Sequence, residues 1–156
     1  MGIETLVENV APTITGVTAE SIVIDDDDDD DDDDDNGSGA DDSDEGDSDQ
    51  DEGVLITVSG TFTDPGSLDL HTGAAIWSDG VSTELTVDND NDIFTTTRFL
   101  SEDKLEDKFP EVSDDFPGFD DAFLVGVTIT IEDDDTGMAQ ELLQLIVSEE
   151  EGIITI

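Results

Sequence analysis

The sequence predicts an all-β fold, an antiparallel β-sandwich of about seven short strands. Several stretches alternate apolar and polar residues with a period of two, and turn residues separate them. Long helical patterns do not alternate with these stretches, which argues against a parallel α/β sheet. Residues 25–53 contain no apolar side chain except Ala40 and therefore predict a disordered acidic insertion within the sandwich.

The first predicted strands flank this insertion. Residues 13–24, "TITGVTAESIVI", predict one or two short strands. Residues 54–63, "VLITVSGTFT", predict a half-buried strand whose heavier apolar side chains occupy the even positions. The turn residues "DPGS" end that strand.

The middle of the chain predicts a hairpin and a further strand. "HTGAAIWSDG" predicts a strand closed by an Asp-Gly turn, and "STELTV" continues after it as the second strand of the hairpin. The polar loop "DNDND" follows, and then the threonine-rich strand "IFTTTRFL". Trp77 is expected to be a core residue, as a lone tryptophan in a strand usually is.

The last third begins with a long connection, residues 101–121, which has two prolines and predicts a helical turn around Leu105. "AFLVGVTITIE" is the clearest strand, because its apolar side chains from Phe123 to Ile131 share one face. "MAQELLQLIV" fits a helix or a strand by pattern alone. Its position after the tight turn "DDDTG" and its Leu-Ile-Val ending favour a strand.

These elements predict one domain with short extensions. Residues 1–12 form a linker or N-terminal strand, residues 13–148 form the sandwich, and residues 149–156 form a linker or strand beyond it. The chain has no run of 18 apolar residues, so no membrane insertion is expected. It has no cysteine, which excludes disulfides and zinc–thiolate sites.

The charge is strongly negative, with 46 acidic and 3 basic side chains and a net charge of -43. Such a field repels nucleic acid and anionic membranes and attracts cations. Calcium is the natural cation, because it takes 6–8 oxygen ligands. An equally weighted interpretation is a halophilic or marine surface on which the acidity only maintains solubility.

Three stretches resemble the PKD domain, an immunoglobulin-like module of large microbial surface and secreted proteins. They are "EGVLITVSGTFTDPGSLDLHTGAAIWSDG" (52–80), "FLVGVTITIEDDDTG" (123–137) and the linker-like "VENVAPTIT" (7–15). Two positions depart from the family pattern: "WSDG" stands for Trp-Gly-Asp-Gly, and "TRF" for His-Thr-Tyr, which removes the corner hydroxyl. The resemblance implies an immunoglobulin-like fold and a non-catalytic spacer or adhesive repeat that contacts proteins or carbohydrates.

A calcium site is predicted where alternate loops meet at one end of such a sandwich. Carboxylates that converge there repel one another unless a cation lies between them. The candidate ligands come from the loop after the first long strand, the loop before the last strand and the chain entry: Asp64, Asp69, Asp133, Asp134, Asp135 and Asn9. The alternative is that these aspartates bind no ion and only form solvated turns.

The loop "DNDND" offers a second candidate group, Asp88, Asp90 and Asp92, which lies at the same end as the first group if the predicted strand count is correct. Its alternating acids are similar to the start of an EF-hand loop. The sixth position is Ile93 instead of glycine, and no glutamate stands at position twelve, so an EF-hand is rejected.

No catalytic residues are predicted. His71 is the only histidine, and the resemblance implies that it holds its loop through a hydrogen bond. No Gly-x-Ser-x-Gly motif occurs. Residue type alone leaves a glycosidase open, since paired carboxylates abound, but a chain with 7 Phe, 1 Trp and no Tyr has few aromatics to line a cleft.

The sequence therefore predicts a non-enzymatic, extracellular or cell-surface repeat that binds calcium and has neighbouring repeats or identical subunits as partners. One alternative is a subunit of a secreted filament, in which "MGIETLVENV" or "GIITI" completes the sheet of a neighbour. Another is a module that binds a glycan or a surface protein. The aspartate run is interpreted as a hydrated bristle at the end opposite the calcium site, with cation or mineral contact as a minority use.

Overall fold

The structure is a computed structural model that describes residues 2, 9–24, 52–66, 68–112, 115, 117 and 121–156. The predicted disorder of the acidic insertion concerns residues 25–51, which lie outside these ranges. Gly53, the last residue of the predicted insertion, belongs to a strand.

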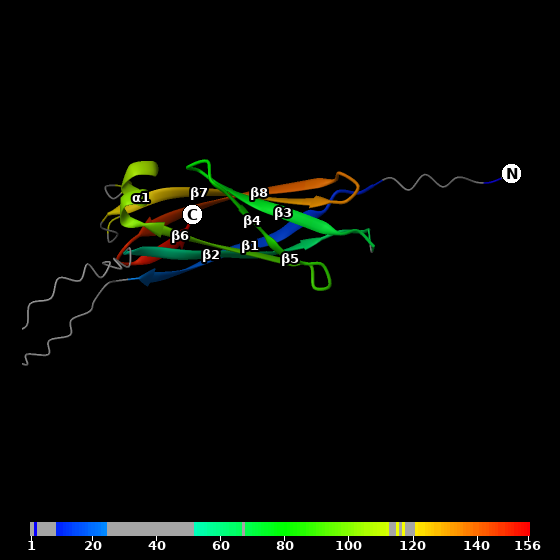
Figure 1. Cartoon of the computed structure of the whole chain (residues 1–156), viewed down its shortest axis with the longest axis horizontal. Coiled ribbons are helices and arrows are strands. Elements are labelled where there is room, and N and C mark those ends of the chain that lie inside the picture. The colour runs from blue at the N-terminus through cyan, green and yellow to red at the C-terminus, as the bar shows by residue number, and fades with distance from the viewer. Residues whose placement is uncertain are drawn as a thin grey trace, which may run out of the picture.

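Two antiparallel sheets pack face to face, which confirms the all-β sandwich (Figure 1). The four-stranded sheet has the order β1 (Thr13–Ile24), β2 (Gly53–Thr63), β6 (Ile93–Ser101), β5 (Thr86–Asp88). The five-stranded sheet has the order β4 (Ser82–Glu84), β3 (His71–Trp77), β7 (Ala122–Asp133), β8 (Met138–Ser148), β9 (Gly152–Thr155). Apart from the outer strands β4 and β9, this is the strand order of an immunoglobulin-type sandwich.

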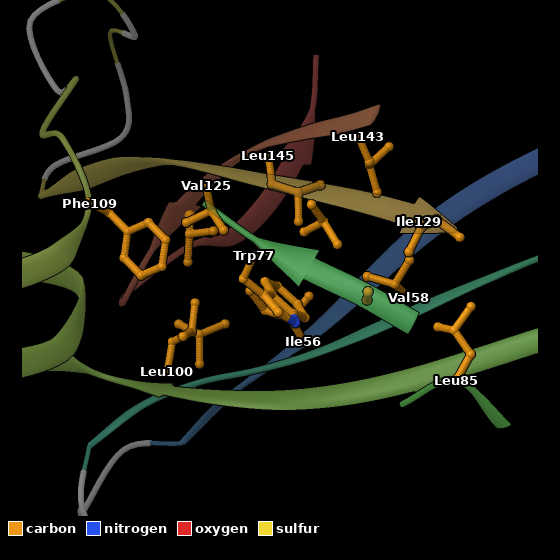
Figure 2. Close-up of a cluster of buried hydrophobic side chains, with 14 of the residues drawn as sticks. Ile56, Val58, Trp77, Leu85, Leu100, Phe109, Val125, Ile129, Leu143 and Leu145 are labelled. Atoms are coloured by element: carbon orange, nitrogen blue, oxygen red, sulfur yellow. The ribbon is translucent and has the colours of Figure 1, made fainter. Parts of the chain in front are cut away.

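The core lies between the sheets and follows from the period-two patterns. In β2 the even apolar residues Val54, Ile56 and Val58 are fully buried, while the odd residues between them are not. β7 repeats this alternation, and Trp77 lies in the middle of the cluster, as predicted (Figure 2). The indole N–H of Trp77 donates to Thr83 Oγ1 at 3.0 Å, so its polar atom is satisfied.

The predicted hairpin is only partly formed. β4 pairs with β3 across a turn in which Gly80 has φ +88°, a value that favours glycine. At the buried Leu85 the chain then changes sheets, and β5 pairs with β6 instead. The predicted single strand is therefore two strands of three residues, one in each sheet.

Residues 149–156 differ from the prediction of a linker or strand beyond the sandwich. β9 pairs with β8 and extends the five-stranded sheet. Gly152, with φ +83°, begins this strand after the tight turn at its N-terminal side. Ile153 packs against the core cluster, and the burial of this apolar side chain stabilises the pairing of β9 with β8.

The long connection contains the expected helical turn, α1 (Glu102–Lys108). Its Leu105 side chain is fully buried, and Phe109 after the helix also joins the core. Within the described ranges, no helix has the length and apolar character that crossing a bilayer requires.

A buried ion pair connects the two sheets. Arg98 of β6 makes two parallel hydrogen bonds to Asp79 in the β3–β4 turn, at 2.9 and 2.5 Å. The guanidinium also lies 5.1 Å from the ring centre of Trp77. The two parallel bonds form a bidentate arginine–carboxylate contact that fixes the β3–β4 turn relative to β6.

The register of β1 and β2 determines the two ends of the molecule. Thr13 pairs with Thr63 at one end, and Ile24 pairs with Gly53 at the other. The chain therefore leaves toward the acidic insertion at the end opposite Asp64, as the sequence predicted (Figure 1).

Candidate metal centre

Three segments far apart in sequence meet at the end of the sandwich where the N-terminal segment enters (Figure 1). They are the chain entry at Asn9, the loop that follows β2, and the β7–β8 turn. The topology explains this convergence, because β2 and β7 both end on this side and β1 begins there.

Asp133, the last residue of β7, organises the β7–β8 turn. Its side chain is buried, and Oδ1 accepts hydrogen bonds from the backbone N–H groups of Gly137 (2.6 Å) and Asp135 (3.0 Å). The side-chain amide of Asn9 donates to Oδ2 at 3.2 Å. A Cβ at Gly137 would lie 2.2 Å from Oδ2, so only glycine fits beside this carboxylate.

Asp64 is held by the histidine of the next strand. Asp64 Oδ2 lies 2.9 Å from His71 Nε2, and Oδ1 accepts the Gly66 backbone N–H at 2.6 Å. Burial alone would raise the pKa of Asp64, but these hydrogen bonds and the His71 charge outweigh it, and the pKa is lowered.

The surroundings of His71 favour the cationic form of its imidazole. Its Nδ1 lies 2.9 Å from Asn89 Oδ1, and its Nε2 faces the carboxylate of Asp64, so both ring nitrogens meet acceptors. Burial alone would lower the pKa of His71, but the hydrogen bonds to Asp64 and Asn89 raise it. The ring also packs against Phe62, with ring centres 4.7 Å apart.

Asp69 differs from both of these aspartates. Within the described ranges its carboxylate accepts no hydrogen bond, and a Cβ at Gly66 would lie 1.8 Å from its Oδ2. Burial, followed by the charges of Asp64 and the three aspartates 133–135, raises the pKa of Asp69. This carboxylate therefore faces other negative groups without a fixed donor.

The carboxylates form two overlapping groups that share Asp69. One group is Asp64, Asp69 and Asp133, and the other is Asp69, Asp134 and Asp135; within each, one oxygen per residue lies within 4.8 Å of the others. Two oxygens that bind one calcium ion at about 2.3–2.6 Å lie at most about 5 Å apart. The spacing therefore suits a single calcium ion in either group.

The second predicted group lies apart from these carboxylates. Asp88 caps its own turn, accepting from the Asp90 and Asn91 backbones at 3.0 and 3.3 Å and from the Asn91 amide at 2.8 Å. These bonds lower the pKa of Asp88. Asp90 and Asp92 are exposed, and neither belongs to the groups of close carboxylates found among the described residues.

Sequence reasoning missed the residue of this loop that does reach the site. Asn89, between the aspartates, accepts from both the backbone N–H and the ring of His71, at 2.8 and 2.9 Å. It also missed Gly66 and Gly137, whose missing side chains leave room for carboxylates. The turn patterns "DPGS" and "DDDTG" contain Gly66 and Gly137, respectively. Only the three-dimensional structure shows that a carboxylate lies where the side chain of each would be.

Comparisons with known proteins add no relative: no family model matches the chain, and no curated protein or solved structure is significantly similar to it.

Proposed function

We propose that this chain is a non-enzymatic β-sandwich repeat of an extracellular or cell-surface protein, stabilised by calcium at the end where its N-terminal segment enters. The observation that carries the proposal is the convergence of Asp64, Asp69 and Asp133 from loops distant in sequence, with oxygens within 4.8 Å. The PKD-like motifs support the role of a spacer or adhesive repeat, and this part of the proposal rests on the sequence.

The charge balance at this end supports a bound cation. Of the three Lys and Arg residues, Arg98 is engaged with Asp79, and Lys104 and Lys108 lie on α1 at the opposite end (Figure 1). His71 is thus the only basic side chain among the described residues of the cluster, and it is paired with Asp64. Asp69 therefore has no positively charged partner among the described residues. A divalent cation beside its carboxylate would supply that charge.

A cation here would also stiffen the entry of the chain. Asn9 is already connected to the β7–β8 turn through Asp133 and through the backbone oxygen of Asp135, at 3.3 Å. An ion bound to Asp69 and Asp133 would join the loop after β2 to the same turn. The junction with whatever precedes Asn9 would then become more rigid, as a spacer repeat requires.

The test compares thermal melts of the chelated protein in calcium, magnesium and sodium chloride of equal ionic strength. We expect sub-millimolar calcium to raise Tm beyond either control salt, because a ligand that binds only the folded state stabilises it. Asp69→Asn should abolish this increment without unfolding the chain, since the Asp69 carboxylate makes no structural hydrogen bond among the described residues.

Asp90→Asn is the matched control, because Asp90 is an exposed aspartate in a turn outside the close groups, and it should retain the calcium response. Equal Tm increases in all three salts would reject the calcium site and leave only screening of the net charge.

Two alternatives remain proposals of lower rank. In the filament alternative, "GIITI" would be a free tail that completes the sheet of a neighbour. In the structure β9 pairs with β8 of its own chain, which weakens this argument for a filament. A module for glycans or surface proteins would use the same loop end, and a glycan-array hit that depends on Asp64 or Asp133 would favour it over a spacer.

A further inference from the structure

The outer face of the four-stranded sheet is almost free of charge, although the chain carries 46 acidic residues. This face consists of the side chains of β1, β2, β6 and β5 that point away from the core. In the described strands its charged members are Glu20 on β1 and Asp88 at the end of β5. The rest are hydroxyl-bearing or apolar residues.

The hydroxyl side chains occupy the centre of this face in cross-strand rows. The register aligns Thr86, Thr95, Ser59 and Thr18 in one row, and Thr97 with Thr57 in the next. Several of these hydroxyls bond to each other across strands: Thr57 with Thr97 at 3.3 Å, and Thr18 with Ser59 at 3.3 Å. These four hydroxyls therefore already have partners within the sheet.

At the end of the face near the acidic insertion lies an apolar row, defined as Ile22, Leu55 and Phe99. Ile22 is 64% exposed, although a side chain of this kind is stabilised by burial. The Phe99 ring lies over Gly53, where a Cβ would come within 2.9 Å of it.

At the other end of the face lies a groove of about 500 Å³. Gly16, at a bulge in β1, leaves the space open, and the groove is lined by Ile93, Phe94, Thr18, Thr61 and neighbouring residues. A Cβ at Gly16 would meet only Thr61 Oγ1, at 3.7 Å, so a side chain there would fill the groove without strain in the fold.

We propose that this face is the interface of a homodimer, in which the apolar row of each copy enters the groove of the other. A two-fold axis across the strands near Val58 places Leu55 of one copy opposite Thr61 of its partner, because the two positions are equally far from Val58. A two-fold interface is self-complementary, so the apolar row and the groove each occur twice.

On the face itself, the same axis keeps the two Glu20 side chains apart. It places Glu20 of each copy opposite Thr18, a hydroxyl that donates to a carboxylate, instead of opposite the second Glu20. Beyond the face, it places Ile24 of each copy at the end where the partner's Asp64 loop lies, so the charges at the two ends oppose association. On a chain with net charge -43, this is a face on which two copies can meet.

The size of the face indicates a weak dimer. Strands about 4.8 Å apart with a rise of about 3.4 Å per residue give a footprint of roughly 600 Å² per copy, below the ~800 Å² of a standard interface. The remaining charge outside the face repels, so association should strengthen as salt screens it.

The test is sedimentation equilibrium of the full chain in EDTA, up to millimolar concentration, at low salt and in about 1 M sodium chloride, where the screening length is about 3 Å. EDTA makes the result independent of the calcium site. We expect a monomer–dimer equilibrium that strengthens with salt. Ile22→Asp should weaken it roughly tenfold or more, and Gly16→Thr should weaken it without adding charge.

Leu142→Asp is the matched control, because Leu142 is 61% exposed on the outer face of the other sheet and should leave the equilibrium unchanged. A monomer under all conditions, or equal effects of Ile22→Asp and Leu142→Asp, would overturn the proposal. If the chain stays monomeric and a neutral glucan such as cellohexaose shifts the amide signals of Thr18, Thr61 and Thr95, the face binds glycan and the homodimer is rejected.

Discussion

The two ends of the sandwich are both acidic, but they accommodate their carboxylates in different ways. At the Asp133 end, fixed donors from Asn9, His71 and the backbone meet the buried carboxylate oxygens. At the other end, Glu149 in the β8–β9 turn has a buried Oε1 without a hydrogen-bond partner in the described structure. The first end is organised for charged carboxylates, and the second favours a protonated one.

The surroundings of Glu149 explain this difference. Burial, and then the charges of Glu102, Glu106, Asp121 and Glu52, raise its pKa to about 7. Glu102 and Glu106 lie on α1, Asp121 precedes β7 and Glu52 precedes β2. Negative side chains from three parts of the fold therefore surround Glu149. The carboxylates at one end are thus stabilised by hydrogen-bond donors, whereas burial and neighbouring negative charges at the other end favour protonation of Glu149.

The largest predicted effect is on the Asp133 end. Asp133→Ala removes the acceptor of the Gly137, Asp135 and Asn9 hydrogen bonds and should lower the free energy of unfolding by about 2–4 kcal/mol. Urea unfolding followed by the fluorescence of the single, buried Trp77 measures the change. Asp134→Ala, at the exposed neighbouring position, should cost less than about 0.5 kcal/mol, and equal losses would contradict the assigned role.

An intermediate effect is predicted at the Glu149 end. The folded-state pKa of Glu149 lies above its ordinary value of 4.5, so stability falls as the pH rises from about 4.5 to about 7. Glu149→Gln should remove this loss and stabilise the protein by about 1–2 kcal/mol at pH 8, less than the full shift implies because the side chain is partly exposed. Unfolding curves at pH 5 and pH 8 test this, and a variant that gains as much at pH 5 would refute the titration of Glu149.

The smallest effect sharpens the description of the Asp133 end. The pKa of His71 is raised, so its pair with Asp64 stabilises the protein fully below the ordinary value of 6.5 and loses this contribution as the pH rises through the folded-state pKa. NMR titration of the single imidazole should give a midpoint above 6.5. Calcium should lower that midpoint, because a cation beside Asp64 repels the imidazolium; an unchanged midpoint would argue against a calcium ion at Asp64.

Local patterns predicted most of the strands. The alternation in β2 and β7 was sufficient because one face of each strand is buried and the other is not. The helical turn at Leu105 and the strand at Met138–Ser148 were also correct. The change of sheet at Leu85 and the pairing of β9 were missed, because both depend on which neighbouring strand is available and not on the local pattern.

The candidate site shows the same division. Turn chemistry identified the loops of Asp64, Asp69 and Asp133, since aspartate and glycine favour such turns. It also singled out Asp88, Asp90 and Asp92, whose pattern is as acidic, whereas the structure brings the intervening Asn89 to His71. Spacing along the chain does not reveal which side of a turn faces another loop.

The sequence by itself determined the all-β class, the positions of the core strands and the excess of negative charge, because periodicity and composition act over a few residues or over the whole chain. Only the tertiary structure decided which carboxylates meet, which of them acquire donors, and which sheet face remains free of charge. These features depend on contacts such as Asn9 with Asp133, 124 residues apart, which form only when strand order and register bring the segments together.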